Sequence, residues 1–118
     1  MKEYIITPVP KPRMTKSDKW KKRPAVMRYW KFKDEVKLAK VKLPKAGCQV
    51  IFFMPMPASW PEHKKLVYEL RAHQQKPDVD NLLKGLMDAV YGDDSGVWDI
   101  HVTKLWGMVG KILIREDL

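Results

Sequence analysis

Two aspartates separated by one residue, Asp78 and Asp80, stand at the start of a predicted helix, and Lys84 follows one turn later. Pro77 favours an extended backbone at the residue before it, so we expect an extended segment to lead into the helix. In an extended segment, the carboxylates of Asp78 and Asp80 point to the same side. Two carboxylates this close repel each other unless a proton or a cation neutralises them. Their oxygen atoms suit Mg²⁺ or Mn²⁺. The pattern therefore favours a divalent-cation site.

Lys84 shares a helix face with the acidic residues on either side of it. At 100° per residue, Asp80, Lys84 and Asp88 fall within about 80° of one another. Lys84 is then placed to offset negative charge on a phosphate, and the nearby helix N-terminus adds partial positive charge. A structural role is also open, with Asp80 as the N-cap and Lys84–Asp88 as an exposed i,i+4 pair. Spacing alone does not decide between these interpretations.

Charge is divided unevenly along the 118 residues, whose formal net charge is +9. Residues 1–77 carry 19 Lys and Arg against 6 Asp and Glu, whereas residues 78–118 carry 4 against 8. A basic surface can bind a phosphate backbone, and clustered carboxylates can hold cations beside it. The same division also fits an acidic stretch that merely offsets a basic one. The excess of positive charge favours a polyanionic partner.

Half of residues 11–24 are Lys or Arg, and Trp20 lies among them. We expect this segment to be an arm that orders on DNA, with cations on phosphates and Trp20 stacked on an unpaired base. The alternative is a solvated loop with Trp20 folded back on the core. Met54, Met56 and Trp60 either form a contact surface or cap the core. The three histidines lack ligand spacing and are expected to be ordinary, partly exposed residues.

Other sequence features exclude several classes of protein. The longest apolar run, 50–58, contains two prolines and is far shorter than the roughly 20 residues of a membrane helix. Cys48 is the single cysteine, which excludes an internal disulfide and favours a reducing, cytoplasmic setting. It lies in an apolar run and is expected in the core. No phosphate-loop motif occurs, so a nucleotide cofactor is not expected.

Periodicity predicts one α+β domain over residues 1–118, in the order β-α-β-α-α-β-β with a mixed or antiparallel sheet. The expected strands are 4–7, 48–54, 98–103 and 111–115, because they are β-branched, aromatic or alternating in polarity. The expected helices are 26–42, 62–70 and 80–91. Leu82, Leu86 and Val90 keep helical spacing in the last of these, and Gly92 is a typical stop.

The block Lys76-Pro-Asp78-Val-Asp80-Asn-Leu-Leu-Lys84-Gly-Leu-Met-Asp88, followed by Asp93-Asp94-Ser and a strand ending Val102-Thr-Lys104, resembles the RusA family of Holliday-junction resolvases. The matched block covers about a quarter of the chain. The resemblance implies a homodimeric endonuclease of phage or prophage type that needs Mg²⁺ or Mn²⁺. It implies symmetric hydrolysis of four-way or otherwise branched DNA during recombination and repair.

Carried over by position, Asp78, Asp80 and Asp94 would bind the metal, and Lys84 and Asp80 would be catalytic. A divalent cation activates water and, together with Lys84, offsets charge on the pentacovalent phosphorus. We expect DNA contacts from the basic residues around this block and in the arm, namely Lys11, Arg13, Lys16, Lys19, Trp20, Lys21, Lys22, Arg23, Lys76 and Lys104.

One departure from the family concerns the third carboxylate. Only Tyr91 and Gly92 separate Val90 from Asp93-Asp94, where family members usually carry several more residues. A helix over 80–90 is about 16 Å long. The four residues that follow span at most about 14 Å when extended, which is too short to bring Asp94 back to the start of that helix. Asp93 and Asp99 are therefore fallback ligands. If the third ligand is weakened, the main alternative function is a protein that binds branched DNA but does not cut it. The second alternative is a basic phage assembly factor.

Overall fold

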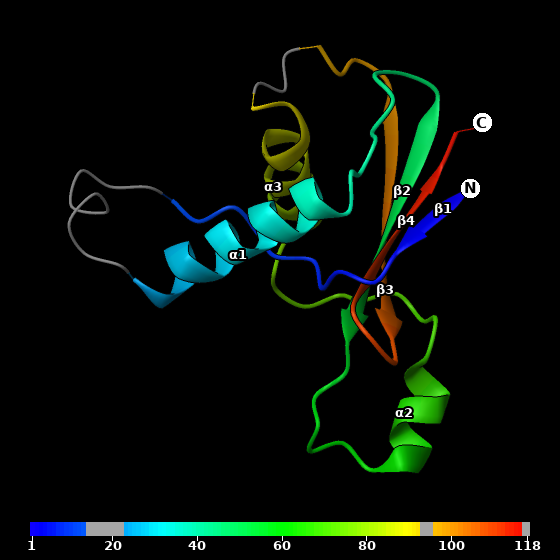
Figure 1. Cartoon of the computed structure of the whole chain (residues 1–118). Helices are drawn as coiled ribbons and strands as arrows, with labels where there is room; N and C mark the ends of the chain where they lie inside the picture. The colour runs from blue at the N-terminus through cyan, green and yellow to red at the C-terminus, as the bar shows by residue number, and fades with distance from the viewer. Residues whose placement is uncertain (14–22, 93–95, 117–118) are drawn as a thin grey trace.

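Among the described residues, a four-stranded mixed sheet carries two helices on one face (Figure 1). The computed structural model describes residues 1–13, 23–92 and 96–116. Along the chain the elements are β1 (Lys2–Tyr4), α1 (Pro24–Leu38), β2 (Cys48–Pro55), α2 (Glu62–Tyr68), α3 (Val79–Tyr91), β3 (Ile100–Gly107) and β4 (Lys111–Arg115). The predicted α+β class and the predicted order of elements are confirmed.

The strands lie in the order β1-β4-β2-β3, which makes β3 one edge of the sheet. β2 and β3 run parallel, with Cys48 opposite Ile100 and Pro55 opposite Gly107. β4 runs antiparallel to both β1 and β2. The parallel pair needs a crossover connection, which α2 and α3 supply. As a result α3 runs back along the sheet and begins near the middle of β3 (Figure 1).

The core lies between the sheet and the α1/α3 layer. Completely buried side chains come from both layers: Phe32 and Val36 from α1, Leu82 and Leu86 from α3, and Val50, Phe52, Ile112 and Ile114 from the sheet. Cys48 is buried in this core as expected, and burial raises the pKa of its thiol. In contrast, α2 buries none of its residues and lies beyond the ends of β2 and β3 (Figure 1). No helix in the described ranges is long and apolar enough to cross a membrane.

Several predicted boundaries were wrong, for reasons of tertiary packing. The first strand is Lys2–Tyr4, because only these residues pair with β4, while Ile6 turns into the core. The helix predicted to reach residue 42 ends at Leu38, where Lys40 adopts φ 53° and Val41 N–H donates to Val36 O. This is a left-handed helix terminus.

The third strand begins later than its alternating pattern suggested. Trp98 was expected to begin this strand, yet it lies before the strand and its side chain is 78% exposed. Pairing with β2 fixes the strand as Ile100–Gly107. At the other end of β2, Met54 and Met56 are buried and the Trp60 ring packs on Trp106, so this segment caps the core, one of the two expected roles.

Candidate active site

A strap formed by residues 70–78 brings the chain along the open edge of β3 to the start of α3. Its first half pairs with the strand: Leu70 N–H donates to Trp106 O, Trp106 N–H to Arg71 O, and His73 N–H to Lys104 O, at 2.9, 2.9 and 3.1 Å. Beyond His73 the strap leaves the strand and leads into the N-terminus of α3. The edge of β3 thus determines where the two aspartates of the motif lie.

Asp78 is the N-cap of α3 and Asp80 lies in its first turn. Asp78 has an extended backbone, and its carbonyl oxygen accepts a 3.2 Å hydrogen bond from Leu82 N–H. Its carboxylate makes no capping hydrogen bond. The alternative of Asp80 as N-cap was therefore wrong. The extended segment expected over 78–80 was wrong as well, because the helix already begins at Val79. The Asp80 carboxylate accepts a hydrogen bond from the Asn81 N–H at 3.0 Å.

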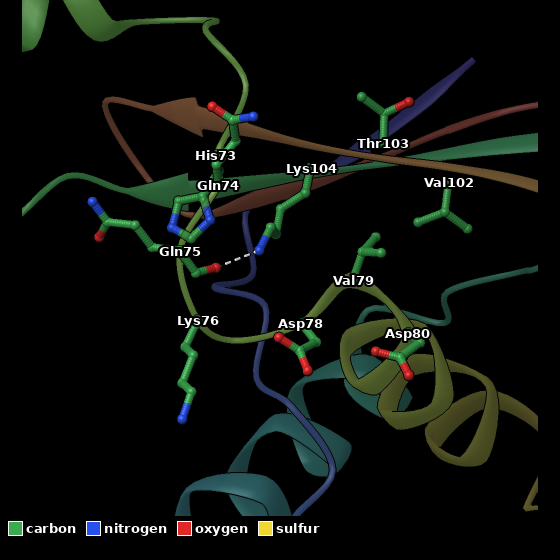
Figure 2. A pocket seen from close by; sticks show the side chains of 10 residues that line it. All are labelled: His73, Gln74, Gln75, Lys76, Asp78, Val79, Asp80, Val102, Thr103 and Lys104. Carbon is green, nitrogen blue, oxygen red and sulfur yellow. Dashed lines mark hydrogen bonds between the residues drawn. The ribbon is translucent and has the colours of Figure 1, made fainter.

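Both carboxylates line one open hollow of about 650 Å³ between the strap, α3 and β3. Figure 2 shows Asp78 and Asp80 on the helix side of this hollow and Lys104 across from them on β3. The lining residues are His73, Gln74, Gln75, Lys76, Asp78, Val79, Asp80, Val102, Thr103 and Lys104. The hollow thus combines two carboxylates with two lysines.

Further hollows lie past the start of α3, toward residues 9–13, which we call the N-terminal segment. A second hollow, of about 480 Å³, shares Lys76 and Asp78 with the first. A third, of about 600 Å³, shares Lys11 and Asn81 with the second and ends at Lys84, Pro12 and Arg13. Through these shared lining residues, the three hollows follow one another as a path from β3, past the two aspartates, to Lys84. Among the described residues, its lining carries five Lys and Arg residues against two aspartates, an excess of positive charge that can bind a phosphate backbone.

Lys84 lies at the rim, close to an acidic residue of the same helix. Its ammonium lies 4.0 Å from Asp88, which also forms an ion pair with Lys11 of the N-terminal segment. The Lys11 N–H donates to Asn81 O at 3.3 Å, so the segment lies along the first turns of α3. The sequence treated Asp88 as the partner in an exposed pair. In the structure its side chain is only 12% exposed and joins two cations that both border the path.

Close contact between Gly85 and its neighbours makes this arrangement possible. A Cβ at Gly85 would lie 3.0 Å from Val9 O and 3.2 Å from Lys11 N. The Tyr29 hydroxyl of α1 donates to Gly85 O at 2.9 Å. Burial, and then the nearby Asp88 carboxylate, raise the pKa of Tyr29 to about 12, so its hydroxyl stays a donor. A glycine at this point lets the N-terminal segment approach α3 directly.

Lys104 points toward the strap. Its ammonium donates to Gln75 O at 2.5 Å and to Pro77 O at 2.6 Å. Burial lowers the pKa of Lys104, and the Asp78 carboxylate partly opposes that effect. The sequence predicted a DNA contact for this lysine, whereas in the described structure its hydrogen bonds go to the protein main chain.

His73 is buried, which the sequence analysis did not foresee. Its side chain is 7% exposed, its ring packs on Trp106 with centroids 4.2 Å apart, and Nδ1 has no hydrogen-bond partner among the described residues. Burial, and then the charge of Lys104, lower the pKa of the imidazole. A lone histidine between polar residues gives no sequence signal for burial, because only the pairing of the strap with β3 places it there.

The structure also locates the other candidate residues that it describes. Arg23 donates to Arg13 O at 2.8 Å, which joins the two ends of the basic segment. Asp99 lies before β3, does not line the hollow, and accepts a hydrogen bond from Gly47 N–H at 3.2 Å. Seven of the predicted residues lie outside the described ranges: Lys16, Lys19, Trp20, Lys21, Lys22, Asp93 and Asp94.

The donor set of the hollow suits a hard cation. Within residues 1–13, 23–92 and 96–116, no group of three His, Cys, Asp or Glu side chains comes together as a metal site. The hollow itself offers two carboxylates, Asp78 and Asp80. Mg²⁺ is commonly bound through one or two carboxylates while it keeps several waters and contacts substrate phosphates. Two carboxylates in an open hollow therefore fit such an ion.

Comparison with known proteins gives one family and one relative. The family Endodeoxyribonuclease RusA matches residues 5–115, nearly the whole chain. The chain is also 38% identical over 74 residues to a protein of Bacillus subtilis (strain 168) named Uncharacterized protein YqaN. That match covers 54% of this chain and 52% of the relative, so the chain spans about half the length of the relative. No solved structure matches.

Proposed function

This chain belongs to the RusA family of endodeoxyribonucleases, and on that premise we propose that it hydrolyses phosphodiester bonds in branched DNA, with four-way junctions as the preferred substrate. The observation that carries the proposal is the joint lining of one open hollow by Asp78 and Asp80, on a path bordered by basic residues. Paired carboxylates beside a phosphate-binding rim suit metal-assisted phosphodiester hydrolysis.

In this proposal Asp78 and Asp80 hold the Mg²⁺ or Mn²⁺. Such an ion would activate water and neutralise charge on the phosphate. Lys84 stabilises the negative charge that develops on the scissile phosphate, and Asp88 keeps it at the rim. Lys11, Arg13 and Lys76 border the same path and bind the flanking phosphates. Family resemblance adds Asp94 as the third carboxylate, with Asp93 and Asp99 as the fallback residues.

Symmetric cutting of a junction requires two sites that face opposite strands. A homodimer with twofold symmetry supplies this geometry, because each protomer then carries an identical site. We therefore propose that the active form is a homodimer. We further propose that it acts in the cytoplasm of a bacterial host, in recombination or repair of host or phage DNA.

A second candidate function is binding of branched DNA without cleavage. The observation that favours it is the short connection of Tyr91 and Gly92 between Val90 and Asp93-Asp94, which limits how far Asp94 can return toward the start of the helix. A site with too few ligands keeps the basic path while losing hydrolysis. Substitution separates the candidates for a third ligand: Asp94→Asn, Asp93→Asn and Asp99→Asn, each assayed alone, should identify one residue whose loss abolishes cleavage if the enzyme interpretation holds.

The test is cleavage of a labelled four-way junction and a linear duplex of matched sequence, in Mg²⁺, in Mn²⁺ and in EDTA. The enzyme interpretation predicts paired, symmetric nicks on the junction that need a divalent cation. Tight junction binding without nicks in either metal would favour the binding protein. Equal affinity for both DNAs without nicks would contradict both.

A further inference from the structure

A side chain of β3 hydrogen-bonds to the strap between β3 and α3. In the described part of the chain, no backbone–backbone hydrogen bond involves residues 74–77. His73 N–H is the last strap group bonded to β3, and Asp78 O is the first bonded within α3. Between these two points, the Lys104 ammonium donates to the carbonyl oxygens of Gln75 and Pro77, at 2.5 and 2.6 Å. Figure 2 shows the bond to Gln75 O as a dashed line.

We propose that Lys104 is a positioning residue for the active site: its ammonium fixes the strap and thereby sets the place of the Asp78 carboxylate in the hollow. Pro77 directly precedes Asp78, so the bond to Pro77 O acts one peptide away from the proposed metal ligand. Hydrogen bonds from an ionised donor are about twice as strong as neutral ones. This inference rests on the proposed function, and it assigns Lys104 a role other than contact with DNA.

The surroundings of Lys104 favour this role over phosphate binding. The Lys104 side chain is partly buried. The strap residue that pairs with Lys104 is the buried His73, whose ring packs on Trp106. An ammonium has three donors, and two are used by the strap carbonyls. To bind a phosphate with these donors, Lys104 would give up its exposed bond to Gln75 O and its part-buried bond to Pro77 O. Loss of the second bond is costly, because a part-buried carbonyl oxygen would be left without its partner. An exposed lysine carries no such cost.

Lys76 provides the matched control. It lines the same hollow, carries the same charge and stands two residues before Asp78, but its side chain is exposed and points away from the strap carbonyls (Figure 2). Loss of its charge should weaken DNA binding while the carboxylates keep their places. Lys104→Met and Lys76→Met therefore remove the same group from the same hollow with different expected results.

The first experiment separates binding from catalysis with single-turnover cleavage of the junction at rising protein concentration. For Lys104→Met we expect the saturating rate to fall at least about tenfold, because small misplacements of a reacting group are costly. Its half-saturating concentration should stay within about threefold of wild type. Lys76→Met should show the reverse, with weaker binding and a saturating rate within about twofold. Identical profiles for the two variants, or a wild-type saturating rate in Lys104→Met, would overturn the proposal.

Restoring the ammonium distinguishes positioning from general damage to the fold. Lys104→Cys, treated with 2-bromoethylamine, gains a thialysine side chain with an ammonium at the position of the original one. We expect this treatment to restore most of the saturating rate. Wild-type protein, in which Cys48 is buried, is treated in parallel as the control. Complete modification without recovery of the rate would contradict the proposal.

Hydrogen exchange tests the same idea without any nuclease activity. Lys104→Met should speed exchange of the amides of residues 74–82, and Lys76→Met should leave them as in wild type. If wild-type protein cuts no DNA, the proposed function fails, yet this measurement still decides the role of Lys104. Unchanged exchange in Lys104→Met would show that the ammonium does not hold the strap.

Discussion

The Lys84 ammonium lies 4.0 Å from the Asp88 carboxylate, one turn further along α3, and the same carboxylate binds Lys11 from the N-terminal segment. One largely buried acid thus holds two cations at the rim of the path that passes Asp78 and Asp80. This links the proposed catalytic lysine to the segment that leads into the basic residues 11–24.

Asp88→Asn should impair both catalysis and stability. Without the carboxylate, Lys84 loses the group that orients it, and Lys11 loses its partner at a site that is 34% exposed. We expect a lower saturating rate of junction cleavage and a free energy of unfolding reduced by about 1 kcal/mol. Urea unfolding and single-turnover kinetics provide the measurements. Asp34→Asn, an exposed carboxylate on α1, is the control, and equal behaviour of the two variants would refute the role assigned to Asp88.

Gly85→Ala should destabilise the protein, the opposite of the usual effect in a helix. Alanine in a helix interior is normally favoured over glycine by about 0.5–1 kcal/mol. Here the added methyl group would lie 3.0 Å from Val9 O and 3.3 Å from the Tyr29 ring. We expect a net loss of about 1–3 kcal/mol, typical of overpacking, and weaker junction binding as the N-terminal segment moves. A variant more stable than wild type in urea would show that the segment does not lie against α3.

His73 should make the protein less stable in mild acid. Burial, and then Lys104, lower its pKa in the folded state relative to the ordinary value of 6.5. Below pH 6.5 the unfolded chain therefore binds more protons than the folded one, and the free energy of unfolding falls as pH falls. His73→Phe should remove this component, whereas His101→Gln, at an exposed position, should keep it. Parallel stability curves for wild type and His73→Phe between about pH 5 and 7 would contradict this account.

Much of the fold follows from local sequence patterns, and the parts that do not are set by distant pairing. The spacing of Leu82 and Leu86 and the stop at Gly92 predicted α3 to within one residue. The alternating pattern that includes Trp98 predicted the start of β3 too early. The start is fixed by the parallel partner strand, Cys48–Pro55, rather than by local polarity. Long-range strand pairing leaves little trace in neighbouring residues.

The candidate site shows the same division. The Asp-x-Asp motif and Lys84 were visible in the sequence, because their spacing is local, and both aspartates line one hollow. Lys104, by contrast, was predicted to contact DNA and not to bind the protein main chain. Its contacts with Gln75 and Pro77 arise where a strap packs on a sheet edge almost 30 residues away in sequence. Buried His73 belongs to the same edge, and no periodic pattern marks either residue.

The central claim is that the hollow lined by Asp78 and Asp80 is where hydrolysis takes place. The most direct measurement compares wild type, Asp80→Asn and the surface control Asp34→Asn for both binding and cleavage of one labelled four-way junction in Mg²⁺ and Mn²⁺. We predict that Asp80→Asn abolishes cleavage while junction affinity is kept or increases, because a negative charge beside the phosphates is removed. Asp34→Asn should match wild type. Wild-type cleavage by Asp80→Asn would place hydrolysis elsewhere and contradict the account.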